Sequence, residues 1–255
     1  MTVPMWLGIL AGQTAAELVK LADESCYRRQ YVKAIDAYRE AMNRIPLGPT
    51  ALSHPFGQNT QANGMYTSDM HVGVGNALLG LAEQLHAGGD EEGAHHARHQ
   101  AANEFRQAVM INTKHCQAQY NLGTLLYSLG DVEGAESHLV NAVTWDHHFV
   151  EARVNLAVVY AEQGEAAAAK AELRQAINFV PDHVPAHQNM ALLMLGNILV
   201  EHDPETTRRV ALDHLRTVVR LTPESAEAHH MLGAALLHTA LRCEVGSRGQ
   251  RVQVC

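Results

Sequence analysis

The sequence has few aromatic residues, no apolar run long enough to cross a bilayer, and no basic stripe. Aromatics make up 5% of the chain, while alanine, leucine and glycine are abundant, and this balance favours closely packed helices. The apolar segment Met5–Gly12 is far shorter than the ~20 residues of a membrane helix and lacks a basic flank, so we expect a strap on the first helix, with a degenerate signal peptide as the alternative. A net charge of −8 without a basic patch argues against nucleic acid as a partner.

Catalytic and cysteine motifs are also missing. Cys26, Cys116, Cys243 and Cys255 are widely spaced without a CxxC pair, which argues against a disulfide framework or a zinc finger and favours reduced thiols in the cytoplasm. We find no phosphate-binding loop, zinc-protease motif or nucleophile elbow, and Gly73-Val74-Gly75 is an isolated glycine pair in a helical context. The sequence therefore predicts neither an enzyme nor a cofactor.

The chain repeats itself at a fixed interval. The segment QYNLG at 119–123 aligns with RVNLA at 153–157, and HQNMA at 187–191 continues the series at the same spacing. Three successive matches at one period are hard to produce by chance. Such a period is typical of stacked repeats, in which each unit buries its apolar face against the next.

These repeats resemble the tetratricopeptide repeat (TPR) family, in which a 34-residue unit forms two antiparallel helices with small and large residues at fixed places. The resemblance implies an all-α fold: a right-handed superhelical solenoid of about five helix hairpins plus a final unpaired helix. It also implies that the first helix of each hairpin lines a concave groove. The matching residues in the two clearest repeats are Leu122, Gly123, Leu126, Gly130, Ala135, Leu139 and Ala142, then Leu156, Ala157, Tyr160, Gly164, Ala169, Leu173, Ala176 and Pro181.

The expected divisions of the chain follow this pattern. They are an N-terminal strap at 1–14, repeat 1 at 15–46, an irregular linker at 47–68, a degenerate repeat 2 at 69–115, repeat 3 at 116–149, repeat 4 at 150–183, repeat 5 with an insertion at 184–225, a half repeat at 226–241 and an irregular tail at 242–255.

Local signals place several helix ends. The linker is rich in proline, glycine, asparagine and threonine, which opposes a continuous helix, so we expect the first helix of repeat 2 at 69–87. Its second helix is expected at 91–111, after an N-cap at Asp90. Thr14 with Glu17 predicts a capping box, and Asp203-Pro204 predicts a capped helix start in repeat 5.

The last expected helix lacks a second helix to pack on it. Its apolar residues Met231, Leu232, Leu236 and Leu237 would then be left partly uncovered. We expect the tail, self-association with a second copy, or a docked partner to cover this end; a truncated or alternatively spliced product is an equal explanation.

Asparagine recurs at one place on three successive first helices, as Asn121, Asn155 and Asn189. An asparagine offers both donor and acceptor groups, which match the C=O and N–H of an extended peptide. We therefore predict a ladder that binds a protein or peptide partner, although asparagine is also common at this place in TPR consensus sequences. Asn76 is a less certain extension of it. The neighbouring groove candidates are Gln117, Tyr120, Thr124, Tyr127, Glu151, Glu162 and Gln188.

The charges early on the first helices indicate which ligands to expect. TPR proteins that grip a C-terminal carboxylate use cations early on their first helices. The corresponding residues here are Ala16, Gln117, Glu151, Pro185 and Glu227. Because no cationic pair is present, the groove is expected to prefer neutral or basic segments.

The chain has 17 histidines, several of them clustered. His95 and His99 are four apart on an expected helix, with Glu92 one turn earlier, and form a weak candidate for binding zinc, nickel or copper. A genuine site needs further ligands, so we expect these histidines, and also His183 and His187, to be solvated. A metal-binding protein remains an alternative function, alongside a subunit that docks through its last helix.

Overall fold

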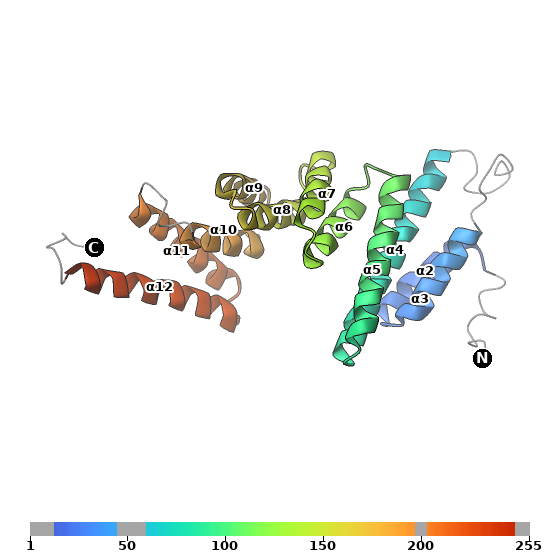
Figure 1. Ribbon diagram of the computed structural model, residues 1–255, viewed down its shortest axis with the longest axis horizontal. Coiled ribbons are helices and arrows are strands. Elements are labelled where there is room, and N and C mark those ends of the chain that lie inside the picture. Colours follow the sequence, from blue (N-terminus) through green and yellow to red (C-terminus); the bar gives the residue numbers. More distant parts are fainter. Residues whose placement is uncertain (1–12, 45–59, 197–202, 248–255) are drawn as a thin grey trace. The chain divides into compact units, whose positions relative to one another are not determined.

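The computed structural model describes residues 13–44, 60–196 and 203–247, and the regular secondary structure within these ranges is entirely α-helical (Figure 1). Successive helices pack in hairpins, as the resemblance implies. The chain divides into two compact units, residues 1–146 and 147–255. Among the described helices, none is both long and apolar enough to cross a bilayer.

The first unit holds three hairpins, each formed by two successive helices. Its first helices, α2, α4 and α6, also contact one another in sequence. The helices are α2 (Ala15–Tyr27), α3 (Tyr31–Asn43), α4 (Thr60–Ala87), α5 (Glu91–Ile111), α6 (Cys116–Ser128) and α7 (Val132–Trp145).

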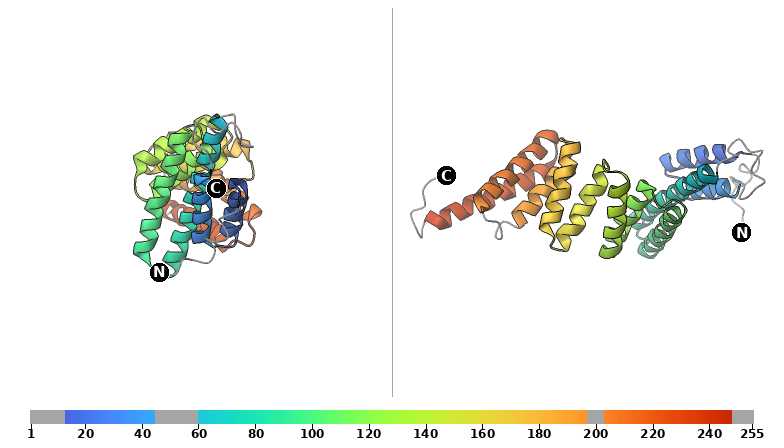
Figure 2. Two further views of the ribbon diagram at one scale, coloured as in Figure 1. Left: turned by 90° about the vertical axis from the view of Figure 1, so that its right-hand side faces the viewer. Right: turned by 90° about the horizontal axis from the view of Figure 1, so that it is seen from above.

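The second unit holds two hairpins and a final helix, which packs on the helix before it. The first helices α8 and α10 are neighbours. The helices are α8 (Val150–Glu162), α9 (Ala166–Phe179), α10 (Val184–Gly196), α11 (Pro204–Leu221) and α12 (Ala226–Ser247), and Figure 2 shows them from two further sides.

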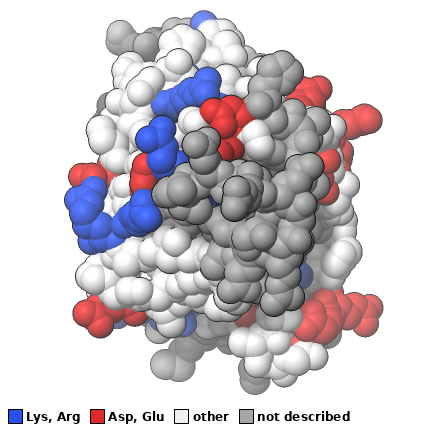
Figure 3. Space-filling model, turned by 90° about the vertical axis from the view of Figure 1, so that its left-hand side faces the viewer, with Lys and Arg blue, Asp and Glu red and all other residues white. Residues whose placement is uncertain are grey.

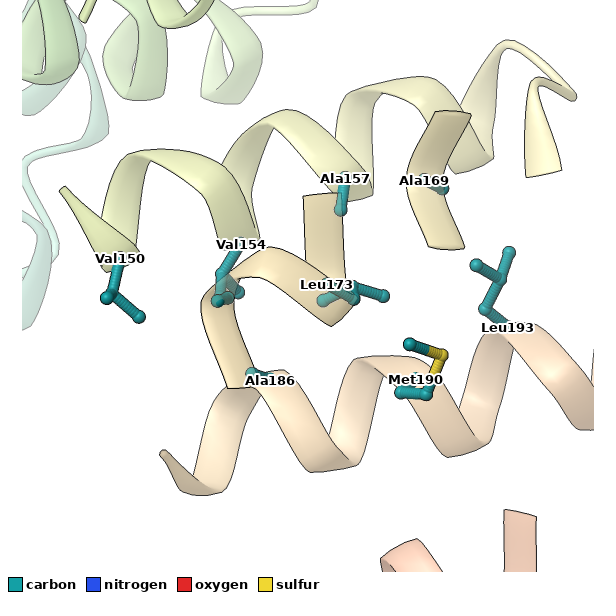
Figure 4. Packing of buried hydrophobic residues seen from close by; sticks show 9 residues of the cluster. Val150, Val154, Ala157, Ala169, Leu173, Ala186, Met190 and Leu193 are labelled. Carbon is teal, nitrogen blue, oxygen red and sulfur yellow. The ribbon is translucent and has the colours of Figure 1, made fainter. Parts of the chain in front are cut away.

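Small residues and leucines build the core within and between hairpins. In the second unit, Val154 of α8, Leu173 of α9 and Met190 of α10 meet in one cluster, and each is at most 4% exposed (Figure 4). Leu173 lies between the two first helices. One second-helix leucine therefore ties its own hairpin to the next, which is how stacked repeats gain stability that a single hairpin lacks.

Local signals explain several helix ends. The capping box at Thr14 and Glu17 is present, and Asp90 and Asp203 accept hydrogen bonds from the first turns of α5 and α11. The hairpin turns at Gly130 and Gly164 have φ of 85° and 81°, a region that glycine enters without steric cost.

Two helices are longer than expected. Helix α4 begins at Thr60 rather than residue 69, so the expectation that the whole of 47–68 is irregular is wrong for its last part. The longer α4 pairs with the far end of α5: Ser68 is fully buried, and its Oγ donates to the carbonyl of Ala108 at 3.0 Å. Helix α12 continues to Ser247, although an irregular tail was expected from 242. Four stretches lie outside the described residues: 1–12 in the expected strap (1–14), 45–59 around the start of the expected linker (47–68), 197–202 in repeat 5 with its expected insertion, and 248–255 in the expected tail (242–255).

Candidate partner-binding surface

The neighbouring first helices α4 and α6 bring three side-chain amides together. Asn121 Nδ2 donates to Asn76 Oδ1 at 2.9 Å, and Gln117 Nε2 donates to Asn121 Oδ1 at 2.7 Å. Asn76 and Gln117 are exposed, and Asn121 is half-buried. This hydrogen bond supports the extension of the asparagine series to Asn76.

The other candidates of α6 lie beside this amide group. Thr124 follows Asn121 by three residues, and Gln117 precedes it by four, so the three share one face of the helix. Tyr120 and Tyr127 are half-buried. We call the exposed side of α4 and α6 around Asn76, Gln117 and Asn121 the first-helix face of the first unit, and the equivalent side of α8 and α10 the first-helix face of the second unit.

In the second unit, the equivalent positions fall on α8 and α10. Asn155 and Asn189 are half-buried on these neighbouring helices, and Gln188 is half-buried beside Asn189. Glu151 and Glu162 are exposed. Leu192, one turn after Asn189, is 52% exposed and was not among the predicted residues, although it occupies the repeat position that Thr124 holds in α6.

Several charged groups in the described residues form ion pairs of opposite sign. In the second unit, Arg216 contacts Asp213 at 2.7 Å and Arg220 contacts Asp182 at 3.5 Å. On the side of the molecule in Figure 3, lysine and arginine side chains lie next to aspartate and glutamate. A surface that binds nucleic acid would instead gather lysine and arginine side chains in one patch.

A second polar feature joins the two helices of the hairpins in repeats 3, 4 and 5, and it was missed at the sequence level. In repeat 3, Gln119 of α6 is 3% exposed, and its Nε2 donates to the carbonyl of Thr113, six residues earlier, at 2.9 Å. Its Oε1 lies 2.7 Å from Nδ1 of His138 on α7, which must therefore be the donor. Burial, and then the charge of Arg106, lowers the pKa of His138 although Asp131 opposes the shift, which favours its neutral form.

Repeats 4 and 5 have the same arrangement with other residues. Arg153 donates to the carbonyl of His147 and to Glu172 on α9, the latter at 2.5 Å. His187 contacts the carbonyl of Pro181 through Nε2 and His214 on α11 through Nδ1, both at 2.8 Å. We call the three pairs the hairpin latch: Gln119 with His138, Arg153 with Glu172, and His187 with His214.

The latch corrects one expectation about the histidines. His187 was expected to be solvated, but it is 7% exposed and hydrogen-bonded on both ring nitrogens. The signal that could have found it is positional, because Gln119, Arg153 and His187 are three different polar residues at one repeat position, inside helices that bury the same face.

The candidate metal ligands lie on α5. The rings of His95 and His99 are 4.6 Å apart between centroids, and Glu92, His95 and His99 are all exposed. In the part of the chain that the structure describes, no three histidine, cysteine or acidic side chains are arranged to hold a metal ion.

Comparisons with known proteins agree with this architecture. Residues 126–193 match the family described as tetratricopeptide repeat. The chain is similar to the crystal structure of YrrB, a TPR protein with an unusual peptide-binding site (TM-score 0.56, 18% identity, covering 85% of this chain and 91% of that one). It is also similar to MamA (0.56, 16%, 85% and 96%) and to TTC0263 of Thermus thermophilus (0.53, 17%, 88% and 100%). At these identities the likeness shows the fold alone. Comparison with curated protein sequences found no match.

Proposed function

Because this chain is a tetratricopeptide-repeat protein, we propose that it is a non-catalytic interaction module that binds extended segments of a partner protein along the first-helix faces of its two units. The observation that carries the proposal is the contact between Asn76 and Asn121 at 2.9 Å, since it joins amides of two successive hairpins on an accessible surface. The shared fold with YrrB, which is described as having a peptide-binding site, supports a peptide as the ligand class.

The amides suit main-chain recognition. Each asparagine offers an amide donor group and a carbonyl acceptor, so it can pair with a peptide group whatever the side chain of the ligand. In the free protein Asn121 is bonded to Gln117 and Asn76, and binding would exchange these bonds for bonds to the ligand. The net contribution is then about 0.5–1.5 kcal/mol for each asparagine. Several are needed for useful affinity.

Charge and apolar contact determine which peptide segments are favoured. Glu151 and Glu162 are exposed on α8, so a neutral or basic segment is favoured over an acidic one. Leu192 adds an apolar contact on α10. We place the protein in the cytoplasm, in keeping with the free thiols of Cys26 and Cys116.

Peptide selection tests the proposal. A displayed library of random peptides is selected on the full chain, and the Kd of a recovered peptide is then measured for the triple variant Asn121→Ala, Asn155→Ala, Asn189→Ala. Three lost hydrogen-bonding groups are expected to weaken binding by about tenfold or more. Asn178→Ala is the matched control, because Asn178 is exposed on the second helix α9.

Two results contradict the proposal. One is unchanged affinity in the triple variant, which would put the site elsewhere. The other is selection of acidic C-terminal peptides, which the charge on the first-helix face of the second unit disfavours.

A further inference from the structure

Helix α12 has the features of a first helix whose second helix is missing from the described residues. His229 of α12 and His187 of α10 each contact the carbonyl six residues earlier, which for His229 is that of Pro223 at 2.8 Å. The register of the latch therefore continues into α12, shifted along the chain by the insertion in repeat 5. The latch residue is buried in the hairpins of repeats 3, 4 and 5 but exposed in α12.

A glycine in the middle of α12 likewise has no described helix packed on it. By this register, Gly233 corresponds to Gly123 of α6. A Cβ on Gly123 would lie 2.8 Å from Cγ of Leu139 and 3.1 Å from the carbonyl of Ala135, because α7 packs directly on it. A Cβ on Gly233 would meet no described atom within 4 Å.

Two exposed leucines follow that glycine on α12. Leu236 and Leu237 are 42% and 63% exposed, whereas Leu126, the counterpart of Leu236 in α6, is 4% exposed. We call the surface of His229, Gly233 and Leu236 the open seat. The hairpins of repeats 3 and 4 turn at Gly130 and Gly164, but at the corresponding place α12 remains helical up to Ser247.

We propose that the open seat binds one helix of a separate partner protein, which packs there as α7 packs on α6. The pattern that such a helix needs is visible in this chain. The second helices present an alanine, a latch residue three positions later, a leucine directly after it, and a small or β-branched residue three positions further on. The three examples are Ala135, His138, Leu139 and Ala142; Ala169, Glu172, Leu173 and Ala176; and Ala211, His214, Leu215 and Val218.

The imidazole of His229 fixes the chemistry of the partner's latch residue. Its Nε2 faces a carbonyl oxygen, which can only accept a hydrogen bond, so Nε2 carries the proton. In the neutral ring Nδ1 is then an acceptor. The partner helix therefore presents a donor, such as histidine, glutamine or arginine, and the exposed carboxylates of Glu224 and Glu227, which shortly precede His229 in the sequence, favour a cationic one.

The binding test uses a peptide of known pattern. A fluorescent peptide with the sequence of residues 203–222 carries the N-cap and the full face of α11, including His214. Full-length protein is titrated into it, and fluorescence anisotropy gives the Kd. We expect saturable binding that Gly233→Leu weakens more than tenfold, because the new side chain fills the seat.

Matched variants identify the contact. His229→Ala removes one hydrogen bond and is expected to weaken binding by about threefold to tenfold. His230→Ala, next to it and also exposed, is expected to leave the Kd unchanged. The substitution His214→Leu in the peptide is expected to leave the Kd for the His229→Ala protein unchanged.

Three results would overturn the proposal. Absence of binding to the unaltered protein means that the seat does not accept such a helix. Binding that survives Gly233→Leu means that the peptide exchanges with α11 instead. Self-association in sedimentation analysis that Gly233→Leu abolishes means that a second copy, and not a separate partner, fills the seat. The first-helix faces are untouched by these variants, so their own test remains independent.

Discussion

Leucine at two equivalent glycines should have opposite effects on stability. Gly123 lies against α7, where even a Cβ would be 2.8 Å from Cγ of Leu139 and 3.1 Å from the backbone oxygen of Ala135. Gly233 occupies the same repeat position on α12 and meets no described atom. The pair therefore compares one substitution in a closed hairpin and in an open one.

The magnitude follows from two terms. Leucine favours a helix over glycine by about 0.8 kcal/mol at either place. At Gly123 this gain is opposed by overpacking, which costs about 3 kcal/mol when a buried backbone must move, and leaves a net loss of about 2 kcal/mol. At Gly233 no steric cost arises, so the free energy of unfolding should stay the same or rise by up to about 0.8 kcal/mol.

Thermal unfolding followed by helical circular dichroism measures both variants. For a chain of this size, about 2 kcal/mol corresponds to a fall in Tm of roughly 4–8 °C for Gly123→Leu. Gly233→Leu should not lower the Tm. An equal fall in both would refute the reasoning, because Gly233 would then be packed like Gly123; an unchanged Tm for Gly123→Leu would show that this contact does not set the spacing of α6 and α7.

Three further predictions concern the second unit. Leu173→Ala should destabilise the protein by about 2–5 kcal/mol in urea unfolding, because Leu173 is 1% exposed among three helices. Arg153→Met should cost about 3 kcal/mol, since it leaves the mostly buried carboxylate of its partner uncompensated, and removing that carboxylate as well should restore much of the loss. Burial and the nearby His187 lower the pKa of His214, while Asp213 opposes the shift. As the pH falls, the unfolded chain therefore binds a proton before the folded protein does, which destabilises the fold. The urea midpoint should decrease from pH 7.5 through 6.5, the ordinary pKa of histidine, and below, and it should decrease less in His214→Gln.

The periodic part of the fold could be predicted because its signals are local. The glycine pair before Asp90 and the cap itself bound α5 at the predicted residues. The start of α4 could not be found in this way, since the residues before 69 have a turn-like composition. Their helix is supported at a distance, where buried Ser68 bonds to Ala108 at the far end of α5. Tertiary packing thus overrides local propensity here.

Tertiary packing also explains two glycines of α4. Gly73-Val74-Gly75 is an isolated glycine pair and not a catalytic motif, and the rings of Tyr38 and Phe105 lie against these two glycines from α3 and α5. Phe105 is fully buried. A side chain on either glycine would occupy the space of a ring, so the pair lets large aromatics fill the space between helices in a chain with few of them.

Histidine composition alone could not separate structural from exposed rings. His187 and His95 are both members of clusters, yet the first is buried in the latch and the second lies exposed on α5. The difference comes from register, because position 187 falls on the face that the second helix covers. For the binding residues, the asparagine spacing predicted one face of neighbouring helices, but only the structure brings Gln117 and Asn76 to Asn121.

The open seat can select both the apolar character and the register of a docked helix, through different residues. Covering a large apolar side chain such as Leu236 contributes up to about 1.5–3 kcal/mol, so apolar contact would supply most of the affinity. Apolar contact alone allows a docked helix to slide by a turn. A single hydrogen bond at His229 adds little energy but is lost on such a slip, as it would be for His187 if α11 moved relative to α10. Apolar contact would therefore hold the helix, and the imidazole would select its register.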